Sequence, residues 1–403
     1  MSRDGCGATL GAMSTPPVTA PDPAEVDVPA LEVRGELPVE LDGAYVRHAP
    51  GPRSVPAGNG ALHRVVVRDG GAGYSTRPGR PTGTVSTASE VTVVRPAGRL
   101  LTFADPGVTA RPKVDPRTGE IVVSRCHLDP PYLTWWVIRP DGSVTAPLPI
   151  AGLGRPVLVY DTALTEHYVV LVVAPLFLDP PLSWEPEHGT RIAVVPRDGG
   201  PVRWCHDEAF WVRHGAGAHE RDDPAAGNPV VLDHVEWPRP ADLVPGPAGA
   251  RGLLTRVVLD PAAGTVTRTV LDPRSVELPR IDDRRVTSRP GTIAVTCASG
   301  RRHTTVPDAL SWIDPDAGTA ATWPADELVP GEPAYAPCPG TAASDRGWWL
   351  SLAMAPGTGE SWLLVFPAAD PGAGPQARVR LPVRVPPGRH GTWLPARPTG
   401  DRP

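Results

Sequence analysis

The sequence predicts an all-β fold, and three observations carry that prediction. Short segments rich in β-branched and aromatic residues recur between turns. No long stretch keeps a helical period, and the 54 prolines are too frequent for long helices. One turn type, opened by Asp or Pro and closed by Gly, returns along most of the chain. Hairpins repeated this often are typical of a β-propeller, which extends antiparallel meanders without long exposed edges; a pair of β-sandwiches is the alternative.

Six segments have the composition of strands, with Val, Ile, Leu, Thr, Tyr or Trp in short runs that end at turn residues. They are Leu62–Gly70, Tyr132–Gly142, His167–Leu176, Thr190–Gly200, Gly252–Gly264 and Arg346–Met354.

Seven turn signals separate such strands, and each places Gly where a positive φ is expected. Their spacing is irregular, so the sequence alone shows no repeat. They are Asp115–Gly119, Arg139–Ser143, Pro196–Gly200, Asp260–Gly264, Asp314–Gly318, Ala355–Gly359 and Asp370–Gly374.

Length and composition indicate a globular chain of 403 residues, with 40% apolar and 21% charged residues. We expect a flexible N-terminal tail over residues 1–27, a single β-propeller domain over 28–397 and a C-terminal tail over 398–403. The N-terminal segment lacks the apolar run of a signal peptide, and no segment reaches the ~18 apolar residues of a membrane span.

The net charge and the spacing of the cysteines argue against some classes of function. The net charge is −5 and the sequence contains no basic block, which argues against nucleic-acid binding through a basic patch. The five cysteines are scattered and form no CxxC pair, as expected for reduced thiols in a cytoplasmic protein.

The candidate site starts from VPPGRHGTWLP, Val385–Pro395, where His390 stands between glycines and before a Trp. Neutral imidazole is the most frequent transition-metal ligand, and a His on a tight loop can point into a cavity. One His is a weak signal, so a metal site would need partners elsewhere in the chain.

Read together, the motifs resemble the carotenoid cleavage oxygenase family. GELPVELDGAYVRHAPGP (35–52) is similar to the family's "LP..L.G.Y.RNGPNP", and GNGALHRVVVRDGGAGYSTR (58–77) to "GDGM.H....DG.A.Y..R". The remaining motifs follow in the family's order from about Gly35 to Pro395. They are ARPKVDPRTGEI (110–121), VYDTALTEHYVV (159–170), WEPEHGTRIAVVPRDG (184–199), WVRHGAGAHE (211–220), VELPRID (276–282), GEPAYAPCPG (331–340) and VPPGRHGTWLP.

This resemblance implies a seven-bladed β-propeller with a loop lid over a central site. It also implies an oxidoreductase, a non-haem Fe(II) dioxygenase that cleaves a conjugated C=C bond of a carotenoid, apocarotenoid or stilbene-like substrate. Family members hold the iron with four His residues, one from each of four motifs.

Only two of those four ligand positions keep a His in this sequence. His390 matches the ligand of "GFHG", and His214 matches that of "FH..NA.E". Tyr160 stands at the His position of "HDFAIT", where this chain reads YDTALT. Arg111 stands at the His position of "AHPK.D", where it reads ARPKVD.

The resemblance also assigns carboxylates that orient the ligand imidazoles by accepting the second ring N–H. Glu277 matches the Glu that serves the third His, and Glu332 the Glu that serves the fourth. The Glu for the second His should lie near LLTFADPG, where Asp105 is the nearest carboxylate. The chain is shorter than the family between Asp105 and Arg111.

The replacements weaken the expectation of iron. The Arg111 guanidinium cannot coordinate, and at ~5 Å from a dication it would cost roughly 7 kcal/mol at an effective dielectric of 20. Tyr160 could ligate as a phenolate, which favours Fe(III). A two-His-one-carboxylate site is a further hypothesis, with the carboxylate from Asp105, Asp161 or Glu220.

Two functions therefore remain open: an Fe(II) dioxygenase that uses His214 and His390, or a metal-free pseudoenzyme that binds an apolar or anionic small molecule. The apolar, proline-broken segment Val172–Trp184 corresponds to the region near the substrate tunnel in the family. It predicts peripheral membrane contact or, alternatively, a buried strand followed by a packed loop.

Overall fold

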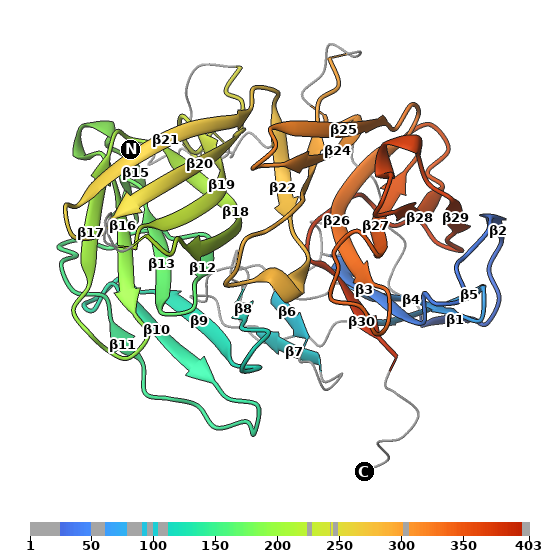
Figure 1. The fold of residues 1–403 in the computed structure, drawn as a ribbon, viewed down its shortest axis with the longest axis horizontal. Helices are drawn as coiled ribbons and strands as arrows, with labels where there is room; N and C mark the ends of the chain where they lie inside the picture. The colour runs from blue at the N-terminus through green and yellow to red at the C-terminus, as the bar shows by residue number, and fades with distance from the viewer. Residues whose placement is uncertain are drawn as a thin grey trace, which may run out of the picture.

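The strands form a seven-bladed β-propeller, which confirms the all-β prediction and decides for the propeller over paired sandwiches (Figure 1). The structure is a computed structural model that describes residues 25–49, 61–78, 91–94, 100–103, 112–223, 228–241, 243–244, 249–300 and 306–396. Within these residues the only helices are three short 3₁₀ turns, at Pro186–His188, Asp283–Arg285 and Pro371–Ala373.

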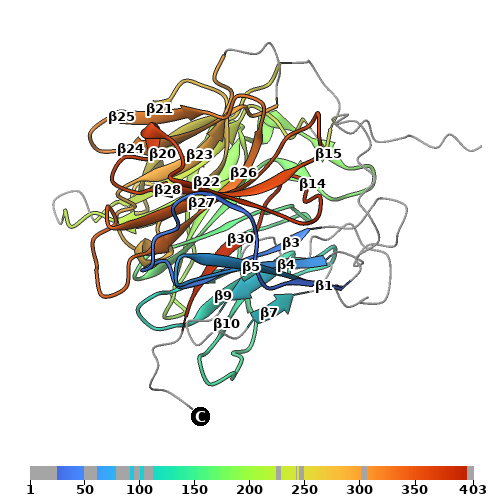
Figure 2. The same ribbon diagram turned by 90° about the vertical axis from the view of Figure 1, so that its right-hand side faces the viewer.

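Strands from the two ends of the chain close the ring. The first blade has the order β1-β5-β4-β3-β30, so a C-terminal strand pairs with an N-terminal one. The seventh has the order β2-β29-β28-β27-β26, so an N-terminal strand completes a C-terminal sheet. Figures 1 and 2 show β30 beside β3, at opposite ends of the colour scale. The bounds are β1 (Val26–Val28), β2 (Val33–Gly35), β3 (Gly43–Ala49), β4 (Ala61–Arg68), β5 (Gly71–Pro78), β26 (Val329–Pro337), β27 (Gly347–Met354), β28 (Ser361–Pro367), β29 (Ala377–Arg380) and β30 (Gly391–Pro395).

The other five blades follow in chain order, the second contributing two described strands and the third to sixth four each. A separate hairpin, β14–β15, leaves the fourth blade. The bounds are β6 (Val91–Val94), β7 (Leu100–Phe103), β8 (Lys113–Val114), β9 (Ile121–Cys126), β10 (Leu133–Ile138), β11 (Leu148–Pro149), β12 (Thr162–Leu164), β13 (Tyr168–Val173), β14 (Leu176–Phe177), β15 (Ser183–Trp184), β16 (Thr190–Pro196), β17 (Arg203–Asp207), β18 (Trp211–Glu220), β19 (Val230–Trp237), β20 (Leu253–Asp260), β21 (Thr265–Asp272), β22 (Val276–Arg280), β23 (Ile293–Cys297), β24 (Ala309–Asp314) and β25 (Thr319–Pro324).

All seven predicted turns connect neighbouring strands of a blade. In the turn between β20 and β21, the Asp260 carboxylate accepts hydrogen bonds from the amides of Ala262 and Ala263, and Gly264 has φ 72°. The turn between β24 and β25 repeats this, with Asp314 as acceptor and Gly318 at φ 67°. A positive φ costs Gly little, so these sequences terminate one strand and start the next.

The innermost strands meet around the propeller axis and carry the site. β12 contacts β18, β18 contacts β22, β22 contacts β26, and β26 contacts β30. Between blades the sheets bury apolar faces: Val170 and Ile192 of the fourth blade pack in one cluster with Phe210, Leu232 and Val257. At roughly 1.5–3 kcal/mol for each fully buried large side chain, this packing fixes the blades relative to the axis.

In the described part of the chain the first strand, β1, begins at Val26 and the last, β30, ends at Pro395. Residues 1–24 and 397–403, which include nearly all of both predicted tails, lie outside the described residues. No helix in the described part of the chain is long and apolar enough to cross a bilayer. Cys126, Cys205, Cys297 and Cys338 are free thiols.

One buried imidazole makes the fifth blade sensitive to acid. His219 of β18 is 4% exposed; burial is the main cause that lowers its pKa from 6.5 to about 4, and Arg256 and Arg289 add to the shift. The unfolded chain therefore binds one more proton than the folded chain between pH 6.5 and 4, so folding stability falls as the pH falls through this window. We expect a loss of up to about 3 kcal/mol from this group.

Urea unfolding at pH 7 and pH 4.5 measures this loss. His219→Gln should unfold with a smaller difference between the two pH values than the unaltered protein. His206→Gln, which changes an exposed imidazole on β17, serves as the control. An unchanged pH difference in His219→Gln would show that other groups cause the acid sensitivity.

Candidate functional site at the propeller axis

The described candidate residues come together at the axis, each on or beside an innermost strand. His214 lies on β18, Glu277 on β22 and Glu332 on β26. His390 directly precedes β30, and Tyr160 lies two residues before β12. The other two predicted positions, Arg111 and Asp105, lie outside the described residues.

His214 and Glu277 form the contact that the sequence predicts. The His214 Nδ1 lies 2.5 Å from Glu277 Oε2, and Trp237 donates its indole N–H to Oε1 at 2.8 Å. Burial alone would raise the pKa of Glu277, but His214, the Leu278 amide and the charge of Arg213 lower it to about 2. An ionised carboxylate at this distance favours the proton on Nδ1 and fixes the imidazole orientation, which leaves the lone pair on Nε2.

Glu332 acts on the backbone next to His390. Its Oε2 accepts hydrogen bonds from the amides of His390 and Gly391. Arg280 donates to the Gly391 carbonyl at 2.8 Å and lies 3.6 Å from the same carboxylate oxygen. These contacts stabilise the left-handed conformation of His390, at φ 65°, and so fix the loop that carries Arg389.

Tyr160 lies against His214 and accepts a hydrogen bond from an arginine. Arg389 Nη1 donates to the Tyr160 hydroxyl at 2.9 Å. The Tyr160 ring meets the His214 ring edge-on, with centroids 5.8 Å apart and an interplanar angle of 89°. The Arg213 guanidinium lies 5.7 Å from the same phenol ring centroid. Burial lowers the pKa of Arg213, and the positive charge of Arg389 adds to the shift. Two guanidinium groups therefore lie against Tyr160, the residue at one of the replaced ligand positions.

Of the carboxylates considered as substitute ligands, the two that the structure describes, Asp161 and Glu220, have other partners. Asp161 Oδ1 pairs with Lys113 at 2.9 Å and accepts from the Thr162 amide, and Oδ2 accepts from the Gly215 amide at 2.8 Å. Asp161 is thus a buried bridge between β8 and β18.

Glu220 does not share the site with His214. It accepts from the backbone and the ring of His167, both at 2.9 Å. It is also six residues further along β18, or roughly 20 Å in an extended strand.

The sequence prediction missed Arg213 and Arg389, although a signal was present. Each of the two His residues at predicted ligand positions is directly preceded by Arg, in RHGAGAHE and GRHG. The family motifs quoted above, "FH..NA.E" and "GFHG", have Phe at both positions. Two apolar neighbours of the ligands have thus become cations.

Comparison with known proteins decides the family. A family model described as retinal pigment epithelial membrane protein matches residues 80–395, more than half of the chain. The chain belongs to this family. A carotenoid cleavage oxygenase of Mycobacterium tuberculosis is 28% identical, with 93% of this chain and 96% of the relative covered. Isoeugenol monooxygenase of Pseudomonas nitroreducens is 24% identical, with 93% and 96% covered. The predicted resemblance to carotenoid cleavage oxygenases is therefore confirmed.

Solved structures of this family share the fold. The lignostilbene dioxygenase of Pseudomonas brassicacearum superimposes with a TM-score of 0.83 at 22% identity, covering 96% of this chain and 100% of that one. Cobalt-substituted Synechocystis apocarotenoid oxygenase gives 0.77 at 20% identity, covering 93% and 97%. The M. tuberculosis alignment runs over 488 residues, more than the 403 of this chain, so that relative contains segments without a counterpart here.

Carotenoid cleavage oxygenases are Fe(II) enzymes, and the cobalt-substituted structure shows that the family has a metal site. The residues of this chain do not fit that metal. Imidazoles stand at two of the four predicted ligand positions, His214 and His390, and the phenol oxygen of Tyr160 accepts a hydrogen bond from Arg389. A guanidinium about 5 Å from a divalent ion would oppose its binding by roughly 7 kcal/mol at an effective dielectric of 20. The donor set resembles an anion-binding site more than an Fe(II) site.

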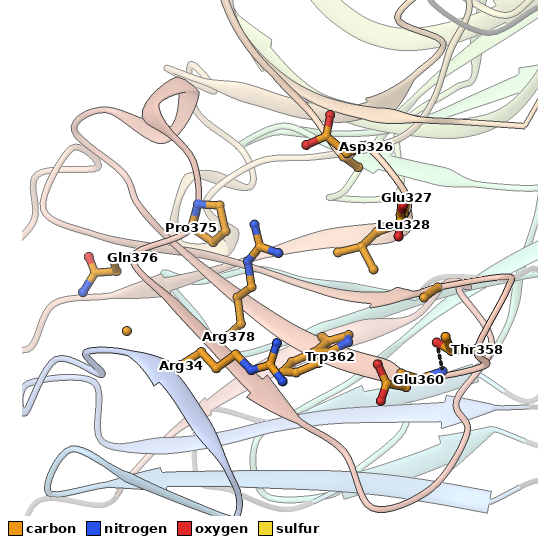
Figure 3. Close-up of a pocket in the computed structure, with 13 residues that line it drawn as sticks. Arg34, Asp326, Glu327, Leu328, Thr358, Glu360, Trp362, Pro375, Gln376 and Arg378 are labelled. Atoms are coloured by element: carbon orange, nitrogen blue, oxygen red, sulfur yellow. Dashed lines mark hydrogen bonds between the residues drawn. The ribbon is translucent and has the colours of Figure 1, made fainter.

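A groove of about 580 Å³ lies away from the axis, on the outer part of the seventh blade (Figure 3). Arg34 of β2 lies 4.6 Å from the ring centroid of Trp362 and pairs with Glu32 at 2.9 Å. None of the predicted site residues that the structure describes lines this groove.

Proposed function

We propose that this chain binds an apolar small molecule at the propeller axis without Fe(II), as a pseudoenzyme of the carotenoid cleavage oxygenase family. The observation that carries the proposal is the hydrogen bond from Arg389 to Tyr160. It places a permanent cation beside Tyr160, which stands where the family motif has a ligand His.

Two observations support an apolar ligand: the compounds for which the relatives are named, and the apolar side chains beside Tyr160. The relatives are named for carotenoids, isoeugenol and lignostilbene, which are apolar and unsaturated. Tyr160 packs in a cluster with buried Trp211 that also includes half-buried apolar side chains. They are Leu158, Trp184, Trp237, Leu243 and Val244.

Iron loading tests the metal-free part of the proposal. The purified protein is incubated anaerobically with Fe(II), desalted and analysed by mass spectrometry beside a His214→Ala, His390→Ala variant. We expect less than about 0.1 iron per chain in both, because two imidazoles flanked by guanidinium groups bind Fe(II) weakly. Iron near one per chain that is lost in the variant would instead support the dioxygenase hypothesis, with His214 and His390 as ligands.

The predicted membrane contact through Val172–Trp184 can involve only the part of this segment that is exposed. Ala174 and Leu176 are buried against Trp211, and the exposed part of the β14–β15 hairpin is Pro180–Leu182. Arg155 stacks on Phe177 and pairs with Glu185, so charges flank the tip. We propose that any membrane contact of this segment is limited to Pro180–Leu182, since its other apolar side chains pack inward.

A further inference from the structure

Arg213, Arg389 and Tyr160 meet at the axis from three different blades. Arg213 comes from β18 of the fifth blade, and Arg389 from the loop before β30 of the first. Tyr160 precedes β12 of the fourth blade and is contacted by both guanidinium groups. All three side chains are half-buried, so each keeps some exposed surface. β12, β18 and β30 surround the middle of the molecule in Figure 1.

Arg389 differs from two other cations near the axis in its partner. Lys113 is matched by Asp161 at 2.9 Å, and Arg280 lies 3.6 Å from Glu332. Across the described residues, Arg389 forms no ion pair with a carboxylate, and its hydrogen bond goes to a neutral phenol. A half-buried guanidinium with a phenol as partner retains donors for an anion.

Tyr160 also packs against apolar side chains. Tyr160 belongs to the cluster with Trp211, whose rings lie 6.2 Å apart, and Leu158 and Trp184 extend this surface. A ligand held here would contact cations at one end and apolar side chains along its body.

We propose that the axis binds the carboxylate of a small molecule with an apolar body, with Arg389 and Arg213 holding the carboxylate and Tyr160 orienting Arg389. A guanidinium matches a planar carboxylate through two parallel N–H···O bonds, which favours carboxylate over an alcohol or aldehyde. The inference rests on the proposed function and specifies its ligand class. It also explains why two Phe positions of the family motifs carry Arg, since both flank the phenol that replaces a ligand.

Two probes with the same polyene body test the inference. All-trans-retinoic acid carries a carboxylate and all-trans-retinol a hydroxyl, and quenching of tryptophan fluorescence measures the affinity of each. We expect retinoic acid to bind about tenfold or more tightly than retinol, because hydrogen bonds to charged groups are the stronger ones. Arg389→Gln and Arg213→Gln should remove most of this preference, because they weaken the binding of retinoic acid more than that of retinol.

Control variants separate a local effect from a general one. Tyr160→Phe removes the hydroxyl that accepts from Arg389 and should reduce the preference in part. Arg203→Gln, at an exposed arginine on the outer strand β17, should leave it unchanged. Equal affinity for both probes in the unaltered protein, or a preference that survives Arg389→Gln and Arg213→Gln together, would overturn the carboxylate site and leave the proposed function intact. If neither probe binds, the proposed function itself is wrong.

Discussion

A variant that returns four positions to the family's residue types is expected to bind near one iron per chain. The variant is Arg111→His, Tyr160→His, Arg213→Phe and Arg389→Phe. It restores four imidazoles, which suit Fe(II) and leave positions for O₂, and it removes the guanidinium groups around the centre. Anaerobic Fe(II) loading followed by mass spectrometry measures the result, against less than about 0.1 iron per chain for the unaltered protein.

A two-residue variant, Arg111→His with Tyr160→His, distinguishes missing ligands from repulsion. It has four imidazoles but keeps Arg213 and Arg389, so we expect clearly less iron than in the four-residue variant. Adding His214→Ala to the four-residue variant should lower its iron content. If the two-residue variant binds as much iron as the four-residue variant, the two arginines do not oppose the metal.

Replacing Arg256 by Met is expected to lower the free energy of unfolding by about 3–5 kcal/mol. Arg256 of β20 pairs in bidentate fashion with Asp233 of β19, at 2.8 and 2.9 Å, and also donates to Asp316 at 2.7 Å. The side chain of Asp233 is 1% exposed, so the variant leaves an ionised carboxylate buried without its main partner. Urea unfolding at pH 7 measures the loss.

The double variant Arg256→Met, Asp233→Leu provides the control for this prediction. With both charges of this pair removed, neither partner is left as an unpaired buried ion, and most of the lost stability should return. A loss below about 1 kcal/mol in the single variant would show that solvent or another cation compensates Asp233.

The sequence predicted the fold where local chemistry determines it. Asp260–Gly264 and Asp314–Gly318 form the expected turns because a carboxylate two residues before the turn amides and a Gly at positive φ act within five residues. Closure of the ring was not predictable from such signals. It depends on the pairing of β30 with β3 and of β2 with β29, which joins opposite ends of the chain.

The motifs predicted the part of the site that they contain. The motifs placed His214 beside Glu277, and the structure contains that hydrogen bond. The motifs assigned Glu332 to His390, and its carboxylate accepts hydrogen bonds from the His390 and Gly391 amides, backbone contacts that depend on loop geometry. Arg389 lies next to His390 in sequence, but its contact with Tyr160 depends on how the first and fourth blades meet at the axis.

Anomalous diffraction from crystals of the unaltered protein tests the central claim most directly. One crystal is soaked anaerobically with Fe(II) and another with 4-bromobenzoate, and anomalous maps are calculated at the iron and bromine edges. We expect no iron peak beside His214, and a bromine peak near Leu158 and Trp184 with the carboxylate on Arg389. An iron peak between His214 and His390, with no bromine at the axis, would contradict the proposed function and support the Fe(II) dioxygenase hypothesis.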